Sequence, residues 1–305
     1  MILLSTYIHY FLYRDIALKR VILHHEQVHG FPLTTLREIS LLKQLKHVNI
    51  VQLLDVTASD RKDSVYLVFE YCDFDFSGLL HDKTDPFNES QIKRLIIQLL
   101  SALQYLHENE VIHRDIKLSN LLYNSSGQFK LADFGLARKL TSRTRTLTPG
   151  VVTLNYRSPE LLMNCASYDY SVDIWSAGCV IFELFTNVML FSSLPGANSN
   201  TLAQLTVIFR VLGAPNASIW PELVDMQWYS SFDTVLPIFQ AENPYNELSS
   251  QSSKVSAEAY EFLNRCLTYS PKKRITAKEA LGHAYLNTML PLPTEEILMP
   301  TFKKE

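Results

Sequence analysis

The stretch HRDIKLSN at residues 113–120 is the most informative part of the sequence. It brings an aspartate, a lysine and an asparagine into one short segment, with only a few residues between them. Asp133-Phe134-Gly135 follows downstream, and Ser158-Pro159-Glu160 comes after it. Each triplet alone is weak evidence, because aspartate and glycine are ordinary turn residues. Their order and spacing, taken together, argue against the alternative that they are ordinary turns without a function.

The three motifs match H-R-D-x-x-x-x-N, D-F-G and A-P-E, with Ser158 as a mild departure from the last. The chain therefore resembles the protein-kinase family over about residues 14–290. The segment PLTTLRE at 32–38 resembles the helix for which some cyclin-dependent kinases are nicknamed. The resemblance is closest to the PITSLRE type and to the transcription-associated cyclin-dependent kinases.

This resemblance implies a protein Ser/Thr kinase that uses ATP and Mg²⁺. Asp115 would orient the substrate hydroxyl, and Lys117 would neutralise charge on the transferred phosphoryl group. Thr153 would bridge these two catalytic residues through its hydroxyl. Asn120 and Asp133 would be the metal ligands.

The same resemblance assigns residues to the ATP site. Lys19 in an A-x-K strand would bind the α and β phosphates and pair with Glu38. Outside this context Lys19 would be an ordinary solvated lysine, and Phe69 an ordinary core residue. The other expected ATP-binding residues are Ala17, Phe69, Glu70, Cys72, Asp75 and Leu122.

A cyclin is the implied partner, bound through residues 32–47. In this family it presses the helix inward and completes the Lys19–Glu38 ion pair, so we expect a misassembled site without cyclin. The alternative is an amphipathic helix that packs on its own sheet in either case.

Thr148 occupies the family's activating phosphorylation position, so a separate activating kinase is also implied. Thr144 and Thr146 compete with it on composition alone. A phosphate adds close to two negative charges and can order a loop against arginines. The expected phosphate clamp consists of Arg37, Arg114 and Arg138.

The implied substrates are proteins with Ser/Thr-Pro sites. Val151, Val152 and Arg157 correspond to the pocket that accepts proline, which has no backbone N–H to satisfy there. Asn155 stands where the family has a tryptophan, which puts the packing of this pocket in doubt. Two further residues match structural positions: Asp173 would brace the catalytic loop, and Arg274 would pair with Glu160.

The sequence predicts an α+β, bilobal protein-kinase fold with a small β-rich lobe and a larger helical lobe. Strand-like runs at 16–21, 49–56 and 65–72 surround a helical pattern through Leu36, Ile39, Leu42 and Leu45. Longer helical patterns follow, and Asn88 with Gln91 fits a capping box for the first. The expected divisions are an apolar lead-in (1–13), a truncated small lobe (14–72), a large lobe (73–290) and a tail (291–305).

Composition agrees with an intracellular globular protein, and the resemblance to transcription-associated kinases implies the nucleus, the cytoplasm or both. The 305 residues are 47% hydrophobic and 19% charged, with a net charge of −3, so no direct contact with nucleic acid is expected. The four cysteines form no C-x-x-C pair, which argues against a zinc site or a disulfide framework. Residues 1–13 are too few for a membrane span.

One part of the kinase pattern is missing. The pattern requires G-x-G-x-x-G before Lys19, but the first glycine is Gly30, so the phosphate-covering hairpin is lacking. A truncated start is favoured over a genuine variant, because Asp115, Asn120 and Asp133 all still match. The alternative function is a catalytically impaired, cyclin-binding module that competes with active kinases.

Overall fold

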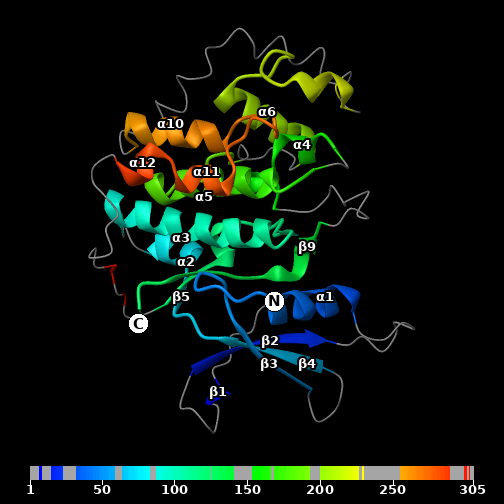
Figure 1. Ribbon diagram of the computed structural model, residues 1–305, viewed down its shortest axis with the longest axis vertical. Helices are drawn as coiled ribbons and strands as arrows, with labels where there is room; N and C mark the ends of the chain where they lie inside the picture. The colour runs from blue at the N-terminus through cyan, green and yellow to red at the C-terminus, as the bar shows by residue number, and fades with distance from the viewer. Residues whose placement is uncertain are drawn as a thin grey trace.

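The structure, a computed structural model, consists of a small lobe built on a β-sheet and a larger lobe of helices (Figure 1). This is the bilobal α+β arrangement that the sequence predicts. The residues described are 7–8, 15–22, 32–58, 64–82, 87–124, 126–140, 153–165, 168–192, 200–226, 229, 255–288, 299–300 and 302. The divisions proposed along the chain stay predictions.

The sheet of the small lobe has four antiparallel strands in the order β1-β2-β4-β3. They are β1 (Tyr7–Ile8), β2 (Asp15–Ile22), β3 (Leu53–Ala58) and β4 (Ser64–Glu70). The central strand β4 is buried at every position except Tyr66 and Glu70. Because β1 pairs with β2, part of the apolar lead-in is a strand.

Helix α1 (Leu33–Gln44) lies between this sheet and the large lobe (Figure 1), and three of the four positions of its apolar pattern are at least partly buried. Leu42 and Leu45 are buried as expected, whereas Leu36 is 47% exposed. Glu38, only 4% exposed, takes the inward position instead. The contacts that hold Glu38 in this position are described below.

Short strands join the two lobes. They are β5 (Phe74–Asp75), β6 (Val111–Ile112), β7 (Leu121–Tyr123), β8 (Phe129–Leu131) and β9 (Arg138–Lys139), arranged as the sheets β5-β7-β8 and β6-β9. The Val51 amide donates to the Leu131 carbonyl at 2.9 Å, and the Leu131 amide donates to the Asn49 carbonyl at 2.8 Å. The strand expected over 49–56 therefore begins only at Leu53, because its first residues bond to the large lobe.

The large lobe is helical. Its described α-helices are α2 (Phe76–Asp82), α3 (Glu89–Glu108), α4 (Pro159–Leu162), α5 (Ser171–Thr186), α6 (Thr201–Leu212), α10 (Ala257–Cys266), α11 (Ala277–Leu281) and α12 (Ala284–Asn287). Short 3₁₀ turns lie at η1 (Leu118–Asn120), η2 (Phe134–Leu136), η3 (Leu154–Tyr156) and η4 (Pro221–Asp225). The capping box predicted for α3 is present, with bonds in both directions between Asn88 and Gln91.

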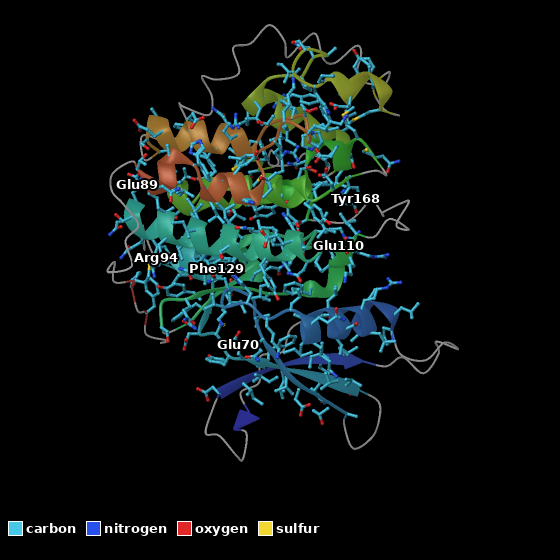
Figure 2. The ribbon with its side chains drawn as sticks, in the orientation of Figure 1. Glu70, Glu89, Arg94, Glu110, Phe129 and Tyr168 are labelled. Atoms are coloured by element: carbon cyan, nitrogen blue, oxygen red, sulfur yellow. The ribbon has the colours of Figure 1, made fainter. Side chains whose placement is uncertain are left out.

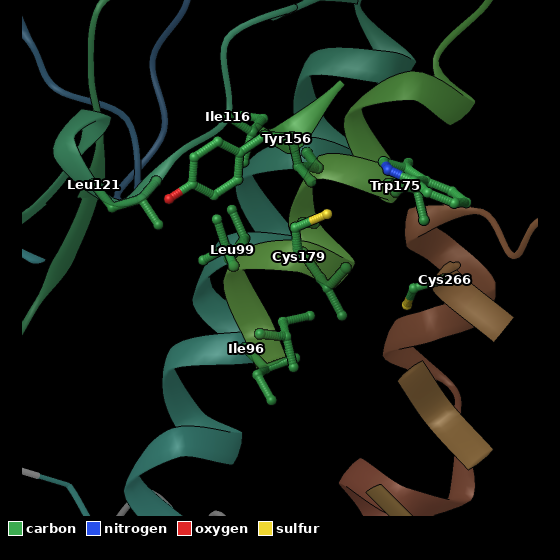
Figure 3. Packing of buried hydrophobic residues seen from close by; sticks show 14 of the residues in the cluster. Ile96, Leu99, Ile116, Leu121, Tyr156, Trp175, Cys179 and Cys266 are labelled. Atoms are coloured by element: carbon green, nitrogen blue, oxygen red, sulfur yellow. The ribbon is translucent and has the colours of Figure 1, made fainter. Parts of the chain in front are cut away.

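Helix α5 is the centre of this lobe, with every residue except Ser171 and Glu183 buried. Side chains of α3 and α5 pack together, and Cys266 of α10 lies on the other side of α5 (Figure 3). A Cβ on Gly178 would lie 3.0 Å from the Cys266 Cβ, so this close approach requires glycine. Across the ranges described above, no helix has both the length and the apolar character needed to cross a membrane.

Candidate active site

A cavity of about 450 Å³ lies between the two lobes. Glu70, at the end of the small sheet that faces the large lobe (Figure 2), is part of its lining. The lining includes both expected metal ligands and all the expected ATP-binding residues: Ala17, Lys19, Glu38, Phe69, Glu70, Cys72, Asp75, Leu122, Asn120 and Asp133. The fold therefore gathers into one space residues that lie up to 116 positions apart in the chain.

Lys19 is held between two carboxylates inside this cavity. Its Nζ lies 2.7 Å from Glu38 Oε1 and 2.8 Å from Asp133 Oδ1. Burial by itself would lower the pKa of Lys19, but the two carboxylates hold it above the usual value. Burial raises the pKa of Glu38, whereas Lys19 outweighs burial at Asp133 and lowers its pKa. The site is thus a charged network with one cation and two acids.

The Lys19–Glu38 pair is closed in this structure, and the expected role of a cyclin in completing it stays a prediction. Helix α1 packs against η2, the turn that carries the D-F-G motif, and this contact turns Glu38 toward Lys19. The buried carboxylate then needs a cation, since an unpaired buried charge is strongly unfavourable. The packing of α1 on η2 and the ion pair therefore support each other in this structure.

The catalytic-loop residues form a second network in the large lobe. Lys117 Nζ lies 2.8 Å from Asp115 Oδ2 and donates to Thr153 Oγ1 at 3.0 Å. The Thr153 hydroxyl in turn donates to Asp115 Oδ1 at 3.2 Å, which is the bridge the sequence predicts. Asn120 Nδ2 donates to Asp115 Oδ2 at 2.9 Å and to the Asp115 carbonyl at 2.8 Å.

Asp173 of α5 orients the catalytic loop by accepting hydrogen bonds from its backbone. Its carboxylate accepts the backbone amides of His113 at 2.9 Å and Arg114 at 2.8 Å, and it lies 3.1 Å from His107 Nε2. Burial alone would raise its pKa, but these interactions outweigh burial and lower it. Arg114 has φ 68°, a left-handed conformation that is costly for arginine and is kept here by the bonds to Asp173.

The three arginines expected to form a phosphate clamp lie close together. Arg114 is 4% exposed and is held by the Leu136 carbonyl at 2.8 Å and the Tyr168 hydroxyl at 3.0 Å. Burial lowers the pKa of Arg138, and the positive charges of Arg37 and Arg114 lower it further. Such a cluster attracts an anion. Thr148, Thr144 and Thr146, its candidate partners, lie outside the described residues.

Val151 and Val152 of the expected proline pocket also lie outside the described residues, whereas Arg157 is partly buried after η3. Next to it, Asn155 uses its amide to donate to the Phe191 carbonyl at 3.0 Å. The residue that replaces tryptophan is therefore anchored by a hydrogen bond.

Glu160 and Arg274 form the ion pair that the sequence predicts. Arg274 Nη1 lies 2.7 Å from Glu160 Oε1, and Nη2 lies 3.0 Å from Oε2, with both side chains almost fully buried. Arg274 also donates to three carbonyls and lies over the Trp175 ring. This pair lies away from the cavity and has a structural role.

Sequence reasoning missed part of the cavity wall, namely Leu18, Val51, Asp73, Phe74, Gly78, Leu79, Ser119 and Ala132. It also missed the pair between Lys130 of β8 and Glu70, whose charged atoms are 3.0 Å apart. Glu70 further accepts from the Gln52 amide at 2.8 Å. A lysine in the buried run between Phe129 and Leu131 was the available signal, because a lysine is rarely buried without a partner.

The donor chemistry near Lys19 fits a hard divalent cation. Asn120 uses its amide nitrogen for Asp115, so its amide oxygen is the atom suited to a metal. Asp133 offers a second carboxylate oxygen beside the one that binds Lys19. Oxygen ligands of this kind suit Mg²⁺, which usually binds few carboxylates and keeps waters or phosphates.

The comparisons with known proteins agree with this geometry. A family model for the protein kinase domain matches residues 12–286. Probable cyclin-dependent kinase 10 of Dictyostelium discoideum is 42% identical over 289 residues, covering 95% of this chain and 76% of its own. Cyclin-dependent kinase 10 of Homo sapiens is 40% identical over 287 residues, with 94% and 76% covered.

Among solved structures, the yeast RNA Pol II CTD kinase complex contains a similar chain. It has a TM-score of 0.82 and 36% identity, and the match covers 92% of this chain and 88% of that one. The fold of a small sheet and a helical lobe is thus that of an established family. This chain belongs to the protein kinase family, and within it to the cyclin-dependent Ser/Thr kinases.

Proposed function

We propose that this chain transfers the γ-phosphate of ATP, in the presence of Mg²⁺, to serine or threonine followed by proline. The observation that carries the proposal is that a charged network inside the cavity lies next to a second one in the catalytic loop, which Asn120 of the cavity lining joins through its bond to Asp115. Lys19, Glu38 and Asp133 form one, and Asp115 and Lys117 with Thr153 form the other. Phosphoryl transfer depends mainly on positioning and on electrostatic stabilisation, which such networks supply.

ATP would lie with its base against the link between the lobes. Phe69 and Leu122 supply apolar walls there, and the backbones of Glu70 and Cys72 would hydrogen-bond the base. Asp75 would lie at the entrance. The phosphates would reach Lys19, and Mg²⁺ bound by Asn120 and Asp133 would neutralise their charge.

The substrate hydroxyl would be oriented by Asp115. Lys117, 2.8 Å from that carboxylate, would balance the negative charge that grows on the transferred group. The Thr153 hydroxyl limits the movement of both side chains because it bonds to each. Val151, Val152 and Arg157 are proposed to accept the proline that follows the phosphorylated residue.

A cyclin is the proposed activating partner, and residues 32–47 are its proposed contact. Leu33 and Leu36 of α1 are 67% and 47% exposed, which leaves an apolar surface on the helix that carries Glu38. We also propose that an activating kinase phosphorylates Thr148. Arg37, Arg114 and Arg138 would hold the resulting phosphate, because clustered arginines repel one another until an anion binds.

The test is phosphate transfer from ATP to an array of Ser-Pro peptides by the 305-residue chain, with and without candidate cyclins. Matched peptides with alanine in place of proline report the specificity, and Asp133→Asn provides the blank. We expect a cyclin-stimulated signal that needs proline and is lost in the blank. No transfer by a chain that binds cyclin would refute the catalytic proposal and favour a non-catalytic cyclin-binding module.

A further inference from the structure

The C-terminal part of the chain returns to the junction between the lobes. Its described residues, Met299, Pro300 and Phe302, are called the C-terminal segment below; they lie at the side of the molecule where the lobes meet (Figure 1). Met299 is 8% exposed and belongs to the main core.

Three rings hold Phe302, and they form what is called the aromatic cluster below: Phe74, Phe87 and Tyr123. Phe302 meets Phe74 edge-on at a centroid distance of 5.9 Å and Phe87 edge-on at 5.8 Å. Tyr123 lies 5.9 Å away at a tilted angle. These are the distances and angles at which aromatic pairs attract one another.

Two further contacts fix the position of the C-terminal segment. The Tyr123 hydroxyl donates to the Pro300 carbonyl at 2.7 Å, and Tyr123 is itself fully buried. A Cβ added to Gly127 would lie 2.6 Å from the Met299 Cβ, so the backbones approach closely at the β7–β8 turn. Gly127 also has φ +73°, a conformation that favours glycine.

The aromatic cluster reaches the nucleotide cavity through β5. Phe74 contacts Phe302 and also lines the cavity. In the sheet, Phe74 pairs with Tyr123 and Asp75 pairs with Leu122, which faces the cavity as well. Because β5 has only two residues, its own ladder holds it weakly, and side-chain packing must supply the rest.

We propose that the C-terminal segment holds β5 against β7 and thereby tightens nucleotide binding in the cavity. Phe302 is then a positioning residue, which acts through Phe74 and touches no substrate. This inference rests on the proposed nucleotide binding. It adds that a residue outside the cavity contributes to the affinity for nucleotide. Loss of the Phe302 ring removes three aromatic contacts and releases the wall of the cavity that Phe74 and Asp75 form.

The experiment compares Phe302→Ala with Tyr260→Ala in the full chain. Tyr260 of α10 is a matched control, since it is also a partly buried aromatic residue packed on the core but lies far from the cavity. Two quantities are measured: the Kd for a fluorescent ATP analogue with Mg²⁺, and hydrogen–deuterium exchange over residues 73–76 without nucleotide. Phe302→Leu, which keeps apolar volume without a ring, should give intermediate values.

We expect Phe302→Ala to weaken nucleotide binding about fivefold and to speed exchange over residues 73–76, with neither change in Tyr260→Ala. Unchanged exchange in Phe302→Ala would overturn the inference, and so would an unchanged Kd. An equal loss of affinity in Tyr260→Ala would also overturn it, because the effect would then be general destabilisation. If the unaltered chain binds no nucleotide, the proposed function fails, while exchange over 73–76 still decides whether the C-terminal segment orders β5.

Discussion

Two ion pairs of this chain have similar chemistry and very different surroundings. Lys19–Glu38 lies in the cavity, with the lysine side chain 25% exposed and a second carboxylate, Asp133, at 2.8 Å. Glu160–Arg274 lies inside the large lobe, where both side chains are at most 1% exposed. In the first pair Lys19 contacts two carboxylates and can exchange one for another anion. In the second, called the saturated pair below, Arg274 uses its remaining N–H groups on three backbone carbonyls.

This difference separates a site that performs chemistry from one that preserves geometry. Lys19 can exchange Asp133 for a phosphate at little cost, because Glu38 and Asp133 already share its ammonium group and water reaches the lysine. Arg274 has no comparable alternative, since losing Glu160 would leave a charge buried without its counterion. Removing one member of each pair should therefore affect activity in the first case and stability in the second.

The largest effect is expected from Asp133→Asn in the cavity. The substitution keeps the shape of the side chain but removes the carboxylate proposed to bind Mg²⁺ and to balance Lys19. We expect kcat/KM for peptide phosphorylation to fall about a thousandfold or more, which corresponds to ~4 kcal/mol. Because folding lowers the pKa of Asp133, its carboxylate also supports the fold, so the thermal unfolding midpoint should fall modestly as well. Retained activity would show that another residue binds the metal.

The saturated pair is tested by Arg274→Met. An unpaired Glu160 remains in the core, so the free energy of unfolding should fall by about 3 kcal/mol in urea titrations. The double variant Glu160→Leu with Arg274→Met leaves no charge behind and should recover part of this loss. If the double variant is less stable than Arg274→Met, the pair contributes net stability in its own right.

A smaller effect, with a defined pH dependence, is expected from Asp173→Asn. Folding lowers the pKa of Asp173, so its carboxylate stabilises the fold above the ordinary pKa of 3.8 and loses that contribution as the pH falls further. At pH 7 the variant should be about 2 kcal/mol less stable. Chemical unfolding at several pH values below about 4 should show the difference between the two proteins shrinking. A difference that is constant with pH would mean that Asp173 acts through shape alone.

The smallest effect on stability is expected from Glu38→Gln. Burial raises the pKa of Glu38, so the cost of burying its charge offsets much of its attraction to Lys19 at pH 7. We expect the free energy of unfolding at pH 7 to change by about 0.5 kcal/mol or less. Peptide phosphorylation should still fall, because Lys19 loses the partner that orients it. A large loss of stability would place Glu38 with the saturated pair.

Much of the candidate site could be predicted from residue type and spacing. The loop at 113–120 places its own aspartate, lysine and asparagine within bonding distance, so a local pattern is enough. The capping box at Asn88 is equally local. The inward turn of Glu38 was predicted only through resemblance, since the apolar pattern of α1 pointed to Leu36 instead.

Other features could not be predicted because they depend on packing between distant segments. The hydrogen bond from the Val51 amide to the Leu131 carbonyl shortens the strand expected at 49–56. The local sequence does not indicate which distant carbonyl a buried amide will bond to. The Glu70–Lys130 pair joins residues 60 positions apart. The closed Lys19–Glu38 pair accompanies the packing of α1 on η2, which is a property of the whole chain.

By itself, the sequence determined the family, the candidate catalytic residues and the main helices of the large lobe, because each is encoded within a short stretch of chain. Only the tertiary structure decided which charged side chains pair with one another and where the C-terminal segment lies. Lys19 reaches Asp133 across 114 positions, and Tyr123 reaches Pro300 across 177. Contacts of this kind form only where burial removes water from both groups at once, and burial is a property of the assembled fold.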